Sequence, residues 1–162
     1  MGGFFLMKIL IVYYSRTSNT RKVAEEIQNN LDWDIEEIID TQNRSGIFKY
    51  ITSGFQASRK KLTILENIKN DPASYDLLVI GTPVWAGNIS TPIRTYIHQN
   101  QAKFNNVAFF CTAGGSRFDG TFSEMTELSG TSTIARIGLT AKEVKDESYK
   151  TKITEFIKKI QL

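Results

Sequence analysis

An unbroken apolar segment that runs into a hydroxyl-rich turn is the feature that most constrains what this chain can fold into. Met7 to Tyr14 is mostly apolar and rich in β-branched and aromatic residues, which is typical of a parallel strand buried on both faces. Of the next six residues, Ser15 to Thr20, five carry a hydroxyl or an amide. A helical pattern follows, with apolar residues on one face at Val23, Ala24, Ile27 and Leu31. We expect this strand in the centre of a sheet.

The polar turn has two interpretations. The first turn of a helix has unpaired N–H groups and the positive end of the helix dipole, so a phosphate group can bind there, and hydroxyl groups add further donors. Alternatively, Thr17, Ser18 and Asn19 simply cap the helix. The residues of this turn alone do not choose between a phosphate site and a cap.

The rest of the chain alternates between apolar strands and amphipathic helices. Further strands are expected at Trp33–Ile39, Tyr75–Ile80, Val107–Cys111 and Ile134–Leu139, the first of these at the sheet edge. Helices are expected over Ile47–Asn70 (bent or divided at Gly54), from Ser90 or Thr91 to about His98, over Asp119–Gly130 and over Tyr149–Ile160. The pattern predicts an α/β fold with a five-stranded parallel sheet and helices on both of its faces.

Length and composition fit one soluble domain. The 162 residues are 41% hydrophobic and 23% charged, and we expect a single domain over residues 7–162. Residues 1–6 are interpreted as an extension, either an upstream start or a cloning remnant. A lone cysteine, Cys111, and the lack of a signal-peptide pattern favour a cytoplasmic protein. The net charge of +3 is too small to predict nucleic-acid binding, and no segment predicts membrane insertion.

Three loops should meet at the carboxyl edge of such a sheet, where the strand order reverses and ligands bind. They are Ser15–Thr20, Thr82–Asn88 and Cys111–Ser116. The second carries Trp85, for which we expect an exposed indole that stacks on a flat ligand; the alternative is an indole folded back onto the core. Gly114 and Gly115 in the third loop allow close approach of a ligand edge. Together the loops predict a mononucleotide site with a flat ring.

At these loops the sequence resembles the flavodoxin family, from Met7 to about Ile160. The family phosphate loop [ST]-x-T-G-x-T stands here as Ser15 to Thr20, with Ser18 in place of the glycine. The resemblance implies FMN as cofactor and a short-chain form of the fold, a three-layer, doubly wound, five-stranded parallel sheet with strand order 2-1-3-4-5. It places the FMN phosphate on Ser15, Arg16, Thr17, Ser18, Asn19 and Thr20. It places Trp85 against the isoalloxazine, with the polar ring edge facing Pro83, Val84, Ala86, Gly87, Asn88, Thr112, Ala113, Gly114 and Gly115.

The resemblance also implies a redox function, as a carrier or as a small reductase. Flavodoxins that shuttle electrons are typically strongly acidic, whereas this chain is basic. The expected partners are therefore either a redox protein, or NAD(P)H together with a small acceptor such as a quinone. Flavin carries out that chemistry itself, and no residue is predicted as a catalytic acid or base.

Two rival interpretations stay open at this point. Cys111 and Arg117 have the C-x5-R spacing of cysteine-dependent phosphatases, in which a thiolate and an arginine hold phosphate. A non-catalytic interaction module could also use the same fold. His98 has no second histidine to share a metal ion with, so no metal site is predicted.

Overall fold

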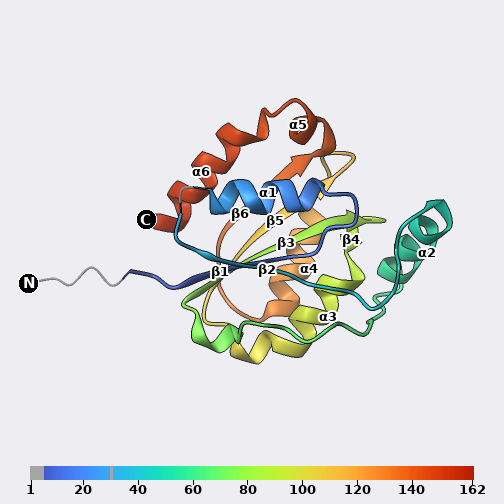
Figure 1. The fold of residues 1–162 in the computed structure, drawn as a ribbon, viewed down its shortest axis with the longest axis horizontal. Helices are drawn as coiled ribbons and strands as arrows, with labels where there is room; N and C mark the ends of the chain where they lie inside the picture. Colours follow the sequence, from blue (N-terminus) through green and yellow to red (C-terminus); the bar gives the residue numbers. More distant parts are fainter. Residues whose placement is uncertain (1–5, 30) are drawn as a thin grey trace, which may run out of the picture.

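The computed structural model describes residues 6–29 and 31–162 and shows a parallel sheet between two helical layers (Figure 1). The interpretation of residues 1–6 falls, except for Leu6, outside the described residues. The parallel strands run in the order β2-β1-β3-β5-β6, and a short strand, β4, pairs antiparallel with β3. Counted without β4, this is the predicted order 2-1-3-4-5. The strands are β1 (Ile9–Tyr13), β2 (Asp34–Glu37), β3 (Leu77–Trp85), β4 (Asn88–Ile89), β5 (Val107–Ala113) and β6 (Thr133–Thr140).

Helices cover both faces of the sheet, as expected for a doubly wound fold. One face is covered by α1 (Asn19–Gln28) and α6 (Tyr149–Gln161), with the short α5 (Ala141–Lys145) beside them, and the other by α3 (Thr91–Asn100) and α4 (Asp119–Ser129). Two 3₁₀ turns lie at Pro72–Ser74 and Gln101–Lys103. The remaining helix, α2 (Ile47–Ser58), stands at the edge of the sheet far from both termini (Figure 1).

The alternation of side chains along each strand supplies two separate cores. On β1, Leu10 and Val12 pack toward α3 and α4, whereas Ile9, Ile11 and Tyr13 pack toward α1 and α6. Strands buried on both faces must be apolar at every position, and all five residues of β1 are buried. This is why the continuous apolar segment at the start of the chain occupies the centre of the sheet.

Two of the expected elements were wrong in extent. The helix predicted over Ile47–Asn70 ends at Ser58, and the chain that follows is extended, with Leu65 in an antiparallel bridge to Asp40. The third strand does not end at Gly81 but continues to Trp85 and turns back as β4. The turn residues Ala86 and Gly87 have φ values of 48° and 75°, as in the two-residue turns that suit β-hairpins.

Candidate functional site

The three loops predicted to converge do meet at the carboxyl edge of the sheet. The hydroxyl groups of Thr20 and Thr112, 92 residues apart, lie 2.8 Å from each other and are buried. This contact joins the turn after β1 to the end of β5. The hydroxyl of Thr121, at the start of α4, donates to the carbonyl of Gly87 at 3.1 Å, which ties the hairpin to the same edge.

The residue that precedes α1 does not cap the helix with its own side chain. Ser18 has φ 72° and ψ −6°, in the left-handed region, and its side chain makes no capping hydrogen bond. The hydroxyl that does accept from this helix belongs to Ser15, from the N–H of Arg21 at 3.2 Å. The capping interpretation is therefore wrong for Ser18. The positive end of the helix dipole at this turn is suited to an anion.

We predict that Ser18→Gly stabilises the protein. A left-handed conformation costs a residue with a side chain about 1–2 kcal/mol, and the greater freedom of glycine in the unfolded chain offsets roughly half of that gain. We expect the free energy of unfolding to rise by about 0.5–1 kcal/mol in urea denaturation. Glu147→Gly is the matched control, since Glu147 has φ 64° far from the loop. A loss of stability in Ser18→Gly alone would show that the serine side chain supports the turn.

Trp85 lies in the core rather than on the surface. Only 4% of the residue is exposed, and its ring meets Tyr14 edge to face at a centroid distance of 5.6 Å. The prediction of an exposed indole was wrong, because the hairpin holds the ring against Tyr14 while two guanidinium groups cover it. Those groups belong to Arg16 at 5.0 Å and Arg44 at 5.3 Å from the ring centroid.

A cavity of about 300 Å³ lies beside this tryptophan. Its walls come from the turn after β1, from the hairpin and from α2, and its lining residues are Arg16, Tyr50, Ile51, Gly54, Phe55, Ser58, Trp85 and Ala86. Its size is at the lower end of the range for small-molecule sites. Of the residues predicted from sequence, Arg16, Trp85 and Ala86 line it.

The flat guanidinium group of Arg16 lies between two aromatic rings in this cavity. Its guanidinium carbon lies 4.5 Å from the centroid of Tyr50 and 5.0 Å from that of Trp85. Burial lowers the pKa of Arg16. Burial also raises the pKa of Tyr14 to about 12, so Tyr14 keeps its proton near neutral pH and is not poised for acid or base catalysis at pH 7.

Several donors around the cavity lack partners among the residues that the structure describes. They are Nη1 of Arg16, Nη2 of Arg44 and Nε1 of Trp85, all buried. Buried polar groups are normally hydrogen-bonded, so these donors indicate a ligand that brings acceptors. The chemistry of these donors matches a ring with carbonyl and nitrogen acceptors.

The α2 wall of the cavity was missed from sequence. Five of its lining residues, Tyr50, Ile51, Gly54, Phe55 and Ser58, lie in a segment for which the sequence predicted a helix and no site. Gly54, for which a bend or a division of the helix was predicted, faces the hairpin: a Cβ at this position would lie 3.7 Å from the Cβ of Ala86. The available signal was the apolar residues at helical spacing in this segment, most of which are exposed.

The other predicted residues lie along the same edge outside the cavity lining. Thr17, Gly114 and Gly115 are exposed, and Asn19, Pro83, Val84, Asn88 and Ala113 are half-buried. Gly87 is the second residue of the hairpin turn and is also exposed. Their contact with a cofactor stays a prediction.

The phosphatase interpretation of Cys111 was wrong. The residue is fully buried on β5, with its sulfur 3.8 Å from that of Met125, and burial raises the pKa of the thiol well above its ordinary value. A phosphatase of this type needs an accessible thiolate, and Arg117 lies on the exposed loop beyond the strand. The C-x5-R spacing here is a coincidence of a core cysteine and a surface arginine.

Residues 6–29 and 31–162 offer no group of three His, Cys, Asp or Glu side chains that could hold a metal ion. The same ranges contain no helix with the length and apolar character needed to cross a membrane.

The fold and the site thus define a doubly wound α/β protein with a mononucleotide-type cavity at the carboxyl edge of its sheet. A family model described as flavodoxin matches residues 8–160. The chain belongs to the flavodoxin family, as the resemblance of its loops implied. No curated protein matches it.

Solved structures support the same placement. A flavoprotein from Lactobacillus acidophilus NCFM, crystallised in complex with FMN, is 28% identical with a TM-score of 0.73, over 92% of this chain and 99% of that one. The apo form of the flavoprotein from the same organism, solved by NMR, is 28% identical with a TM-score of 0.63, over 87% and 97%. The two-electron reduced flavodoxin of Megasphaera elsdenii is 18% identical with a TM-score of 0.60, over 93% and 98%, and shows similarity of fold.

Proposed function

We propose that this protein binds FMN without a covalent bond and transfers electrons through it. The observation that carries the proposal is the cavity beside Trp85, in which the guanidinium group of Arg16 lies between two aromatic rings next to the start of α1. Family membership and the FMN complex of the Lactobacillus flavoprotein support the choice of cofactor. Bound FMN supplies the redox chemistry, accepting and donating one or two electrons.

The residues of this chain position and tune such a cofactor. The turn from Ser15 to Thr20 and the first N–H groups of α1 would hold the phosphate. Trp85 and Tyr50 would contact the ring, and the unpaired donors of Arg16 and Trp85 would face its acceptor atoms. A fixed positive charge at this edge favours a ring that gains negative charge on reduction.

We further propose that the protein is a small reductase that passes electrons from NAD(P)H to a small acceptor such as a quinone. The second candidate function is that of a carrier that delivers electrons to a redox protein. The specific observation is the net charge of +3, because carriers of this family are typically acidic. Bound FMN would supply this chemistry by accepting a hydride from the nicotinamide and passing two electrons on to the quinone. Overall, NAD(P)H, one proton from water and the quinone would give NAD(P)+ and the quinol.

The flavin spectrum of the purified protein tests both proposals. We expect an FMN spectrum, or binding of added FMN, followed by anaerobic bleaching with NADPH or NADH. A protein that takes up no FMN refutes the cofactor. FMN that is bound but not bleached by either nicotinamide favours the carrier.

Tyr50→Ala tests the cavity as the ring site. Because Tyr50 is exposed and lies on α2, its removal does not open the core. Stacking on an aromatic side chain is worth about 1–3 kcal/mol for nucleic-acid bases, so we expect FMN to bind roughly 5- to 150-fold more weakly. Phe48→Ala, on the same helix but outside the cavity lining, is the control and should leave affinity unchanged. If Tyr50→Ala and Phe48→Ala bind FMN with equal affinity, the flavin ring does not lie against Tyr50.

A further inference from the structure

Helix α2 buries small and polar residues and exposes its large apolar residues. Its polar residue Ser53 and the small residue Ala57 are buried against the protein, whereas Phe48, Ile51 and Phe55 are 86%, 63% and 53% exposed. These three positions share one side of the helix at spacings of three and four residues. The apolar face of α2 therefore looks outward, at the end of the molecule far from both termini (Figure 1).

Exposed apolar surface is concentrated in this segment. Within residues 6–29, 31–46 and 48–162, eleven large hydrophobic side chains are exposed, and six of them lie between residues 48 and 64: Phe48, Tyr50, Ile51, Phe55, Leu62 and Ile64. Single exposed apolar residues need no explanation, but a contiguous group indicates an interaction surface.

The positive charge of the chain is concentrated in the same place. Residues 41–65 contain five basic residues, Arg44, Lys49, Arg59, Lys60 and Lys61, and no Asp or Glu. Because the whole chain carries +3, the remaining 137 residues together carry −2. Four of the five basic side chains are exposed, and the guanidinium of Arg59 lies 5.0 Å from the ring centroid of Phe55, so the basic group adjoins the apolar face.

We propose that this surface, the outward face of α2 with Lys49 and Arg59–Lys61, docks onto an anionic lipid membrane. Interfacial helices combine Phe or Leu on one face with Lys and Arg beside it, and they bind through apolar burial together with attraction to anionic lipids. Protein interfaces, in contrast, are depleted in lysine, and three of the four exposed basic residues are lysines. The combination favours a lipid surface over an acidic protein.

Docking in this orientation would bring the cavity to the membrane. Ile51 and Phe55 belong both to the outward face and to the cavity lining, so the mouth of the cavity would meet the bilayer surface. An acceptor that partitions into lipid, such as a quinone, then has the shortest path to the site. This step rests on the proposed function, whereas docking itself does not.

Vesicle co-sedimentation of the full-length protein tests the docking. We expect binding to vesicles of phosphatidylcholine with 30% phosphatidylglycerol at low salt, little binding to pure phosphatidylcholine, and release at 0.5 M NaCl. Lys60→Gln/Lys61→Gln should lower the partition coefficient roughly 10- to 30-fold, and Phe48→Ser roughly 10-fold. The matched control is Lys158→Gln/Lys159→Gln, an exposed pair on α6, which should bind as the unchanged protein does.

Four results would overturn the proposal. They are failure to bind anionic vesicles, equal binding to neutral vesicles, binding to polyglutamate in place of vesicles, and conversion of a dimer to a monomer by Phe48→Ser in size-exclusion chromatography. The last two would assign the surface to an acidic protein and to a second copy of the chain. The flavin spectrum is recorded on the same samples. If the protein carries FMN but does not bind vesicles, only the docking proposal is refuted. If the protein binds vesicles but takes up no FMN, only the proposed function is refuted.

Discussion

Replacing Gly81 with alanine is expected to destabilise the protein by at least about 3 kcal/mol, a severe case of overpacking. Gly81 lies in β3 beside Phe110 of β5, and a Cβ at this position would stand 1.9 Å from Cζ of the Phe110 ring. The ring is fully buried between rigid neighbouring strands, so it has little room to move. Urea denaturation of Gly81→Ala, compared with the unchanged protein, measures the loss.

Gly120→Ala and a double variant complete this experiment. Gly120 lies in α4 with nothing within 4 Å of a Cβ, so its replacement should be neutral or stabilising by up to about 1 kcal/mol. Gly81→Ala/Phe110→Leu should recover part of the loss, since the smaller side chain vacates the space of the ring. Full stability of Gly81→Ala alone would mean that Phe110 has another position available in the core.

The sheet could be predicted because its central strands are buried. A strand covered on both faces must be apolar throughout, and this marks β1, the first part of β3 and β5. Alternation with helices predicted parallel strands with helices on both faces, whereas the order of the strands came from the resemblance of the loops to the flavodoxin family. Both predictions were confirmed.

Two elements were mispredicted because distant contacts override the local pattern. Leu62, Leu65 and Ile68 have helical spacing, yet the backbone N–H of Asn70 donates to the carboxylate of Glu36 at 3.0 Å, and Leu65 bridges Asp40. These contacts hold the segment extended along the edge. The hairpin after β3 escaped notice because Ala86 fills a turn position that Asn or Gly usually takes, and Trp85 was therefore placed in an open loop.

The candidate site likewise has one part that the local sequence predicts and one part that depends on distant contacts. The turn from Ser15 to Thr20 is a local feature, and its left-handed residue stands where the family pattern has glycine. The α2 wall of the cavity depends instead on Arg44. Its side chain pairs with Asp40, which precedes it in the chain, donates to Ser53 and Gln56 on α2, and lies over the ring of Trp85. A basic residue in a polar turn gives no sign in the sequence that it will be buried.

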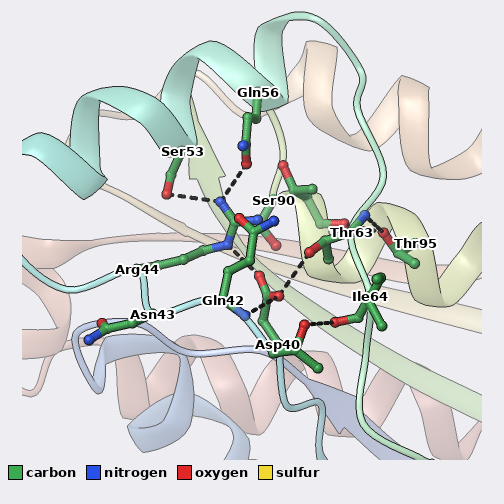
Figure 2. A network of polar contacts seen from close by, with 12 residues as sticks. Asp40, Gln42, Asn43, Arg44, Ser53, Gln56, Thr63, Ile64, Ser90 and Thr95 are labelled. Atoms are coloured by element: carbon green, nitrogen blue, oxygen red, sulfur yellow. Dashed lines mark hydrogen bonds and ion pairs between the residues drawn. The ribbon is translucent and has the colours of Figure 1, made fainter.

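Replacing Arg44 with methionine is expected to detach α2 and to abolish most FMN binding. The Arg44 and Asp40 side chains are 3% and 2% exposed and form an ion pair. Arg44 also donates to Ser53 at 3.1 Å and to Gln56 at 2.8 Å, both on α2. Figure 2 shows Arg44 extended between Asp40 and these two side chains. Losing one partner of a buried ion pair costs about 3–5 kcal/mol.

The effect should be local, because α2 contributes little to the two cores. Once detached, it exposes Asp40 to water, which limits the cost to the sheet. We expect the core to lose only part of this free energy of unfolding, whereas trypsin should cleave rapidly after Arg59, Lys60 or Lys61. Arg21→Met is the control, since the Arg21–Glu37 pair is largely exposed, with 44% and 25% of the side chains accessible, and such pairs contribute about 0–1 kcal/mol.

A double variant separates the unpaired charge from the lost attachment. In Asp40→Asn/Arg44→Met no charge is left buried, so the stability of the core should return toward that of the unchanged protein. The bonds to Ser53 and Gln56 are still missing, so α2 should stay open to trypsin and FMN affinity should stay low, because Tyr50 leaves with the helix. Wild-type FMN affinity in a variant whose α2 is cleaved would show that the ring binds without this wall, and would confine the cofactor site to the three loops at the sheet edge.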